Sequence, residues 1–312
     1  MTQHVVSVSG GKDSAACYLL AIERGVPFRA VTADTGHEAE ETYEWIRQLS
    51  DRTGGPSVEV VRQDFTIQIN RKRDLVKSKW VEEGVDDEII AAALDVLHPT
   101  GIPFLDLCLW KGRFPSRRAQ FCTEWLKSVP IYSQVFEPIM REETLVRWQG
   151  ERRDESPNRA NLPRFQKVRA KGLHPALIFR PIVFWNAGNT FEMHRRHGLT
   201  WNPLYEAGMT RVGCFPCINA NKGELKSIKL RAPDVVEKLL YFERLVSMSS
   251  KRGQATFFAP GVTPERTRPD GSFPKADRVM DWAETSRGGK QYDLLSRLDD
   301  DTGCSSEYGL CE

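Results

Sequence analysis

The chain has 312 residues, of which 40% are hydrophobic and 28% are charged, a balance typical of a folded globular protein and not of a disordered one. Its 44 basic and 42 acidic residues nearly cancel, which excludes a protein that coats polyanions with its whole surface but leaves local basic patches open. No apolar stretch approaches the roughly 20 residues of a membrane span, and no basic region precedes the first apolar run. We therefore expect a cytoplasmic protein with no membrane contact.

The first 65 residues alternate between strand-like and helix-like segments. Apolar runs at 5–9, 28–33 and 58–65 predict strands, and the stretches 15–23 and 38–51 between them predict helices. Strands separated by helices indicate βαβ units and hence a parallel sheet. The sequence therefore predicts an α/β fold with a doubly wound parallel sheet.

Beyond residue 65 the sequence predicts more helices and two more strands. The expected helical stretches are 66–100 and part of 225–248, and the expected strands are 144–148 and 177–185. Pro181 disfavours regular pairing in the second of these strands. Residues 251–312 are rich in Gly, Pro and charge and predict an irregular extension. We expect two domains, an α/β domain over 1–220 and a helical and irregular extension over 221–312.

The first predicted strand ends in the segment Ser9-Gly10-Gly11-Lys12-Asp13-Ser14, which leads into the first predicted helix. The two glycines allow a tight turn and a close approach of the backbone to a ligand. The helix start carries the positive end of the helix dipole, the lysine adds a full positive charge, and the serines add hydroxyl groups. Together these groups suit a phosphate or pyrophosphate, although an ordinary glycine turn before a helix is the alternative. Neither the GxxxxGK[ST] nor the GxGxxG signature is present.

This hexapeptide resembles the PP-loop of the ATP pyrophosphatases, which share a fold with the PAPS (phosphoadenosine phosphosulfate) reductase family. Four later segments resemble the same family in the same order. They are Asp34-Thr35-Gly36 with Glu41-Thr42, Cys122 with Leu126-Lys127, 150–156 with Arg159, and Asn202-Pro203-Leu204-Tyr205 followed by Gly208 and 213–217. The resemblance covers about residues 5–218 and implies the adenine nucleotide α-hydrolase (PP-loop) type of fold.

The resemblance also implies a bound adenine nucleotide, either ATP or a sulfonucleotide. The implied nucleotide-binding residues are Ser9, Gly10, Gly11, Lys12, Asp13, Ser14, Asp34, Thr35, Gly150, Arg152, Arg153, Ser156 and Arg159. Guanidinium groups suit phosphate or sulfate because they donate paired hydrogen bonds. On composition alone, the three arginines fit equally well a solvated cluster that the neighbouring acidic residues balance.

Two reactions are open for such a site. In the ATP-splitting members that this chain resembles, the lysine-containing loop and Mg²⁺ hold the phosphates while an acceptor oxygen is adenylated and pyrophosphate is released. The reductases instead use a cysteine in a Glu-Cys-Gly-Leu-His segment near the chain end, where this chain has Glu307-Tyr308-Gly309-Leu310-Cys311-Glu312. We favour ATP cleavage. The catalytic candidates are Lys12, Asp13, Arg152 and Arg153, with Cys311 for the reductase alternative.

A third possibility is a binding module without turnover. The resemblance extends to PAPS-reductase-like proteins of phages, of DNA phosphorothioation systems and of type IV CRISPR loci. It therefore implies CRISPR or DNA-modification proteins as candidate partners.

The seven cysteines are an odd number in a long chain, which disfavours a disulfide framework and fits a reduced setting. Cys214 and Cys217 have the spacing of a metal site, and the resemblance adds Cys122. In the cluster-bearing reductases that the chain resembles, such cysteines hold a [4Fe–4S] cluster, whose fourth ligand here is Cys304 or Cys311, with Cys304 preferred. Zinc and a redox-active cysteine pair are the alternatives. A cluster beside an ATP-cleaving site would serve sulfur transfer, which implies a sulfur donor.

Three basic runs predict surfaces that favour a phosphate backbone. They are 71–73 with Lys77 and Lys79; Lys111, Arg113, Arg117 and Arg118; and Arg164, Lys167, Arg169 and Lys171. The interleaved aromatic residues, which are able to stack on bases, are Trp110, Phe114, Phe121 and Phe165. tRNA or DNA is therefore a candidate partner, and solvated helix faces with buried aromatic rings are the alternative. His194 and His197 are expected to be exposed on a helix.

Overall fold

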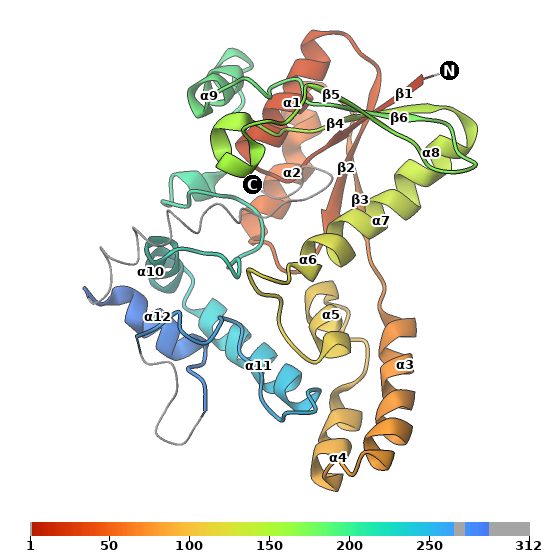
Figure 1. Ribbon diagram of the computed structural model, residues 1–312. Coiled ribbons are helices and arrows are strands. Elements are labelled where there is room, and N and C mark those ends of the chain that lie inside the picture. Colours follow the sequence, from red (N-terminus) through yellow and green to blue (C-terminus); the bar gives the residue numbers. More distant parts are fainter. Residues whose placement is uncertain (1, 265–271, 287–312) are drawn as a thin grey trace. The chain divides into compact units, whose positions relative to one another are not determined.

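The computed structural model describes residues 2–264 and 272–286 (Figure 1). Their contacts group them into two compact units. The sheet unit comprises residues 2–63 and 123–215, and the helical unit comprises residues 64–122, 216–264 and 272–286. These units group segments by contact, and the two-domain division at residue 220 stays a prediction.

The sheet unit contains one six-stranded sheet with the order β3-β2-β1-β4-β6-β5. The strands are β1 (Thr2–Ser7), β2 (Phe28–Asp34), β3 (Val58–Arg62), β4 (Thr144–Trp148), β5 (Phe165–Val168) and β6 (Ala176–Phe179). All neighbouring pairs are parallel except β5 with β6. The predicted doubly wound sheet is therefore confirmed. The chain moves outward from β1 to β3 and then returns to place β4 on the other side of β1, so the switch point where such sheets bind ligands lies between β1 and β4.

Helices cover both faces of this sheet (Figure 1). The first face packs against α1 (Lys12–Glu23), α2 (Glu40–Thr53) and α9 (Ala187–Arg196). The second face packs against the continuous helical stretch of η2 (Glu124–Ser128), α7 (Val129–Ile131), η3 (Tyr132–Phe136) and α8 (Glu137–Glu142). Because side chains alternate along a strand, Val6 joins the first core and Val5 the second.

The helical unit is built around aromatic side chains. Its elements are α3 (Thr66–Leu75), η1 (Val76–Trp80), α4 (Asp87–Val96), α5 (Pro103–Lys111), α10 (Lys222–Arg231), α11 (Asp234–Met248) and α12 (Ala276–Glu284). Phe104 of α5 lies with its ring centroid 6.4 Å from that of Phe242 of α11 and 6.0 Å from that of Phe257. Contacts between aromatic rings from segments that are far apart in the sequence thus stabilise this unit. Of the helices in the two described ranges, none combines the length and the apolar character that crossing a membrane requires.

The structure corrects three expectations about these elements. α12 lies in the stretch predicted to be irregular, and its Ala276, Val279, Met280 and Ala283 are buried along one helix face. β6 ends at Phe179 and not at residue 185, since a turn that contains Pro181 follows it. β5 was not predicted, because its Phe-Gln-Lys-Val sequence is short and mostly exposed.

Candidate functional site

The glycine-lysine segment 9–14 runs from just after β1 into the first turn of α1, beside the switch point of the sheet. Gly10 has a φ of +84°, and a Cβ atom at this residue would lie 2.7 Å from Thr42 Cγ2. A glycine is therefore required both by the backbone conformation and by the close packing on α2. Gly11 is the N-cap of α1 and has no side-chain capping bond. The first turn of a 12-residue helix thus follows directly from the bend, an arrangement that favours an anion.

Ser9 and Ser14 hold the bend in shape. Their hydroxyl oxygens lie 3.0 Å apart, and both residues are buried. Ser14 Oγ accepts a hydrogen bond from the Ser9 amide at 3.1 Å and donates to the carbonyl of Gly11 at 3.0 Å. The two hydroxyl groups therefore fix the loop internally, and their predicted contact with a nucleotide stays a prediction.

Lys12, Asp13 and Arg152 form a charged triad at the start of α1. Lys12 Nζ lies 3.2 Å from Asp13 Oδ2, and the Arg152 guanidinium donates two hydrogen bonds to the Asp13 carboxylate at 2.7 and 3.1 Å. Asp13 is fully buried and Arg152 is nearly so. Two cations share the Asp13 carboxylate, and the Arg152 guanidinium also lies 3.3 Å from the exposed Asp154 carboxylate. Arg152 therefore pairs with two carboxylates, and the Lys12 ammonium is the more exposed of the two cations at the positive end of the helix dipole.

Gly150 brings the segment after β4 against this triad. A Cβ atom at Gly150 would lie 2.7 Å from the carbonyl carbon and oxygen of Asp13 and 2.8 Å from the amide nitrogen of Ser14. Backbone atoms cannot move aside easily, so only glycine permits this approach. Gly150 and Arg152 therefore both contact the glycine-lysine loop directly, which is where the sequence predicted their roles.

The other two predicted arginines bind neighbouring residues of their own segment. Arg153 donates to the carbonyl of Leu162 from Nε at 3.0 Å and from Nη2 at 2.9 Å. Arg159 forms an ion pair with Glu155, and its amide donates to the carbonyl of Ser156 at 2.9 Å. These contacts shape the two short 3₁₀ helices η4 (Arg153–Glu155) and η5 (Pro157–Arg159). Anion binding by Arg153, Arg159 and Ser156 stays a prediction.

Two residues of the Asn-Pro-Leu-Tyr segment complete the loop from the opposite side. The hydroxyl oxygen of Tyr205 accepts a hydrogen bond from the Lys12 amide at 3.1 Å, and the Lys12 ammonium lies 5.2 Å from the centre of the Tyr205 ring. Asn202 Nδ2 donates to Thr42 Oγ1 at 3.1 Å and to the carbonyl of Gly10 at 3.4 Å. In the sequence, these contacts are indicated by the Asn-Pro-Leu-Tyr segment and its place in the order of family motifs, and not by a pattern of neighbouring residues.

The expectation that His194 is exposed is wrong. Its side chain is fully buried on α9, and Nε2 lies 3.0 Å from the carbonyl oxygen of Lys12. Burial lowers the pKa of His194, which favours a neutral ring whose Nε2–H donates to that carbonyl. A usable sequence signal was present, since Thr190, Met193 and His194 share the buried face of α9.

A cavity of about 200 Å³ opens beside the loop, at the carboxyl ends of β1 and β2. Ser9, Asp34 and Lys127 are among its lining residues. Asp34 Oδ1 accepts hydrogen bonds from the Tyr43 hydroxyl at 2.7 Å and from the Gly36 amide at 2.8 Å. Burial is the largest cause that raises the pKa of Tyr43, and the nearby Glu38 and Asp34 carboxylates raise it further. The Tyr43 hydroxyl group therefore keeps its proton and lies between the two carboxylates.

Thr35 does not reach this cavity as a lining residue. It is fully buried, and its hydroxyl group donates to the Glu38 carboxylate at 2.7 Å. Thr35 therefore helps to position Glu38, which lines the cavity. Its predicted direct contact with the nucleotide stays a prediction.

The predicted metal ligands are divided between the two units. Cys214 lies in the sheet unit and forms an isolated backbone bridge with Glu38, whereas Cys122 and Cys217 belong to the helical unit. Cys304 and Cys311 lie outside the described residues. Within residues 2–264 and 272–286, no three His, Cys, Asp or Glu side chains form a group that could hold a metal ion. The predicted [4Fe–4S] cluster and the four-thiolate zinc alternative therefore stay predictions.

A known protein family matches most of this chain, including the site. Residues 3–93 and 108–220 match the phosphoadenosine phosphosulfate reductase domain. The chain belongs to the PAPS reductase family. The match includes the glycine-lysine loop, the segment after β4 and the Asn-Pro-Leu-Tyr segment, and it confirms the resemblance identified in the sequence. The family takes its name from an enzyme that reduces a sulfonucleotide, and it is a family of nucleotide-binding enzymes.

Among its relatives is an uncharacterised 37.8 kDa protein of Escherichia phage 186, which is 43% identical over 329 aligned residues that cover 100% of this chain and 97% of the relative. The phosphoadenosine 5′-phosphosulfate reductase of Proteus mirabilis is 24% identical over 219 residues, which cover 68% of this chain and 69% of that enzyme.

Solved structures that are similar to this chain include the PAPS reductase of Candida auris in a phosphate complex. Its TM-score is 0.40, and the identity is 14% over 69% of this chain and 82% of that chain. The FMN adenylyltransferase of Candida glabrata, solved with FAD and inorganic pyrophosphate, has a TM-score of 0.39 and 15% identity over 69% of this chain and 55% of that chain.

Proposed function

We propose that this PAPS reductase family member binds ATP at the glycine-lysine loop and cleaves it between the α and β phosphates to activate an acceptor. The proposal is carried by the triad of Lys12, Asp13 and Arg152 at the start of α1. The Lys12 ammonium and the helix dipole favour the developing charge of a pyrophosphate leaving group. The loop is fixed from both sides by Tyr205 and Gly150, so little reorganisation would accompany catalysis.

The reaction follows from where each part of ATP would lie. The phosphates would lie on the loop, and the nucleoside would enter the 200 Å³ cavity beside Ser9, where the Asp34 carboxylate accepts hydrogen bonds. An acceptor oxygen attacks the α-phosphorus, the bond from that phosphorus to the bridging oxygen breaks, and pyrophosphate leaves. The acceptor proton passes to solvent. The acceptor becomes an AMP ester, and with water as acceptor the product is free AMP.

Mg²⁺ would accompany ATP in this site. It neutralises phosphate oxygens and keeps much of its water shell, so it needs only one or two protein carboxylates. Asp34 and Glu38 line the cavity and supply carboxylates of this kind. Asp13 is less suitable, since its carboxylate is fully buried and paired with both Arg152 and Lys12.

The test is to incubate the purified chain with ATP and Mg²⁺ and to measure AMP and pyrophosphate. We expect Lys12→Ala to lower the rate at least 100-fold, because it removes the ammonium group at the start of α1. Lys171→Ala is the matched control, since this lysine is exposed in the sheet unit, and its rate should stay within twofold of the parent rate. Equal rates for the Lys12 variant and the parent would contradict the proposal.

A sulfonucleotide reductase is the second candidate, and the family match favours it. In this case PAPS or adenosine 5′-phosphosulfate would yield sulfite, and Cys311→Ser would abolish that product. Sulfite formation without AMP and pyrophosphate from ATP would replace the first proposal with this one. ATP binding without either product would indicate a binding module of a CRISPR or DNA-modification system.

The iron–sulfur cluster and its sulfur donor stay predictions. Because the described cysteines form no ligand group, no step of the proposed reaction passes through a cluster. Anaerobic purification with metal analysis tests the prediction directly. About four iron atoms per chain would support the cluster, and one tightly bound zinc atom or no metal would exclude it.

A further inference from the structure

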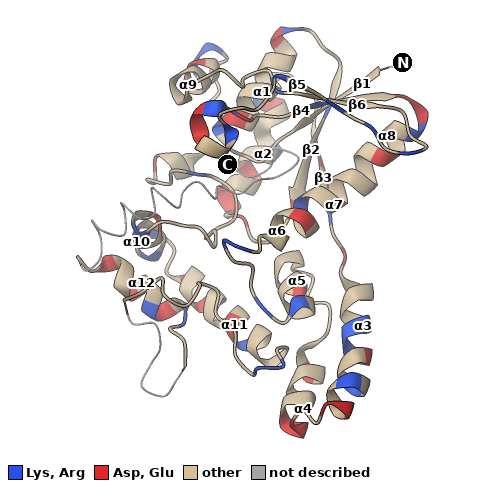
Figure 2. Cartoon of the chain, viewed as in Figure 1, with Lys and Arg blue, Asp and Glu red and all other residues tan. Residues whose placement is uncertain are grey.

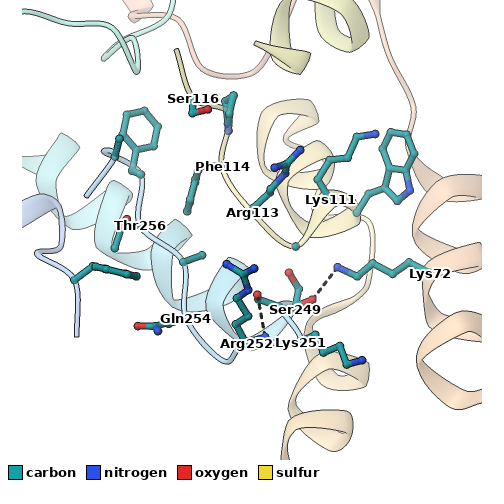
Figure 3. A pocket seen from close by; sticks show the side chains of 18 of the residues that line it. Lys72, Lys111, Arg113, Phe114, Ser116, Ser249, Lys251, Arg252, Gln254 and Thr256 are labelled. Atoms are coloured by element: carbon teal, nitrogen blue, oxygen red, sulfur yellow. Dashed lines mark hydrogen bonds between the residues drawn. The ribbon is translucent and has the colours of Figure 1, made fainter. Parts of the chain in front are cut away.

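A second cavity, of about 690 Å³, lies entirely within the helical unit (Figure 3). It is formed by α3, by the loop after α5 and by the loop after α11. Six of its lining residues are cationic: Arg71, Lys72, Lys111, Arg113, Lys251 and Arg252. No acidic residue is among the described residues that line it. Two of the basic runs seen in the sequence are thus joined here by a third pair of cations.

Lys72 holds the floor of this cavity together. Its ammonium group donates to the carbonyl of Leu109 at 2.7 Å. It also donates to the carbonyl of Ser249 at 2.7 Å (Figure 3). α3 is thereby linked to the ends of both α5 and α11. Gly112 has a φ of +64°, and a Cβ atom there would lie 2.9 Å from Lys72 Nζ. The cations at the rim therefore project from an ordered base.

The positive charge at the rim is poorly balanced within the protein. Lys251 forms an ion pair with Glu83. Arg71, Arg113 and Arg252 are exposed and have no ion pair among residues 2–264 and 272–286. Figure 2 marks Lys and Arg positions in blue on α3 and on the loops that follow α5 and α11. A concave surface with several unbalanced cations attracts a ligand with several negative charges.

An aromatic ring lies beside these cations. Trp110 lines the cavity and is partly exposed, and the Lys111 ammonium lies 3.7 Å from its ring centre. Phe114 forms part of the wall but is buried, as the alternative interpretation of the sequence expected. A base that stacks on this face would take the place of the Lys111 ammonium, which would then be able to pair with the phosphate of the same nucleotide.

We propose that this cavity binds single-stranded nucleic acid, with successive phosphates on the cations and an unpaired base on Trp110. Cations from three separate chain segments fit several phosphates better than the single phosphate group of a mononucleotide. A duplex keeps its bases stacked inside, so it cannot present a ring face to the tryptophan. The site is distinct from the glycine-lysine loop, which belongs to the sheet unit.

Fluorescence anisotropy with a labelled 20-nucleotide oligothymidylate and the full chain tests the proposal over 50–200 mM NaCl. Replacing Arg71, Arg113 and Arg252 by alanine should weaken binding at least tenfold. The slope of log K against log salt should fall by about 2, since each lost phosphate contact on a single strand contributes about 0.7. Trp110→Leu should weaken binding at least fivefold with an unchanged slope, which separates stacking from charge.

The matched control removes the same charge from the sheet unit. Lys167, Arg169 and Lys171 are exposed, and their triple alanine variant should bind within twofold of the parent. Equal losses in the two triple variants would overturn the proposal, as would equal affinity for a duplex or competition by AMP at the nucleotide concentration of the oligomer. Absence of parent binding at 10 μM protein and 50 mM salt would also overturn it.

Folding and catalysis are checked separately. The arginine variant should keep the parent melting temperature and its rate of AMP formation within twofold, because its three residues are exposed and belong to the helical unit, whereas the glycine-lysine loop belongs to the sheet unit. If the triple variant fails to fold, Trp110→Leu and the single Arg113→Ala variant carry the same test. Loss of AMP formation in Lys12→Ala with intact oligonucleotide binding would separate this site from the proposed ATP site.

Discussion

The glycine-lysine loop and the basic cavity both favour anions, but they treat their own positive charge differently. At the loop, two cations share the fully buried carboxylate of Asp13, and each contact is fixed. At the cavity, three exposed arginines have no acidic partner in the described part of the chain, and only the floor is fixed by Lys72. The first arrangement suits one small ligand in one position. The second suits a polymer whose phosphates bind in many registers.

The largest expected effect comes from breaking the buried pair at the loop. Arg152→Met leaves the Asp13 carboxylate buried beside Lys12 alone, so the free energy of unfolding should fall by about 3–5 kcal/mol. Arg113→Ala at the cavity should change it by less than about 0.5 kcal/mol, as at other exposed positions. Urea denaturation of both variants measures the contrast. Similar losses would show that the two sites are not built differently.

A pH titration tests the buried acid of the helical unit, which is not held by an ion pair as Asp13 is. Glu243 of α11 accepts hydrogen bonds from the amides of Phe257 at 2.8 Å and Ala276 at 3.1 Å, and it forms no ion pair within residues 2–264 and 272–286. Burial raises the pKa of Glu243 from 4.5 to about 7. The folded state therefore holds this proton more tightly than the unfolded state. The resulting stability is fully present below pH 4.5 and is lost as the pH rises through about 7.

This contribution amounts to about 3 kcal/mol between those two pH values. We expect the parent protein to lose that much more unfolding free energy than Glu243→Gln when urea denaturation at pH 4.5 is compared with pH 7. Parallel pH profiles for the two proteins would contradict the assignment to Glu243.

Two glycine substitutions sharpen the comparison of the backbones. Gly150→Ala forces a Cβ atom against the backbone of Asp13 and Ser14, and should cost about 1–3 kcal/mol and weaken ATP binding. Gly112→Ala meets mainly the flexible end of Lys72 and a positive φ, and should cost about 1–2 kcal/mol without an effect on ATP. Thermal unfolding and ATP titration are the measurements. ATP affinity that falls in the second variant and not in the first would reverse the assignment.

The smallest expected effect concerns Tyr205. Tyr205→Phe removes the acceptor of the Lys12 amide and should lower the free energy of unfolding by about 0.5–1.5 kcal/mol. ATP affinity should change less than in Lys12→Ala, because the ammonium group is kept. An ATP affinity as low as that of the lysine variant would show that Tyr205 itself contacts the nucleotide.

The sequence predicted the parts of the site that depend on local pattern. The parallel strands and the turn at Gly10 follow from apolar runs and glycine chemistry within a few residues. The bond of Arg152 to Asp13 joins positions 139 residues apart, so no local pattern contains it. His194 was misassigned because a histidine on an amphipathic helix has no intrinsic preference for the buried face. α12 was missed because its apolar face is short and lies between charged residues.

The basic cavity illustrates the same limit. The runs at 71–73 and 111–118 were visible as basic segments, but nothing in either run shows that they meet. The pair Lys251-Arg252 lies in a stretch expected to be irregular, and only the ends of α3, α5 and α11 bring the three segments together. Long-range packing, and not composition, therefore creates this surface.

Calorimetric titration of ATP into three proteins tests whether ATP binds at the glycine-lysine loop. The proteins are the parent, Lys12→Ala and the triple variant that replaces Arg71, Arg113 and Arg252 by alanine. We expect one ATP per chain in the parent, at least tenfold weaker binding in the lysine variant, and unchanged binding in the arginine variant. ATP binding that survives the loss of Lys12 but is lost with the three arginines would contradict this expectation.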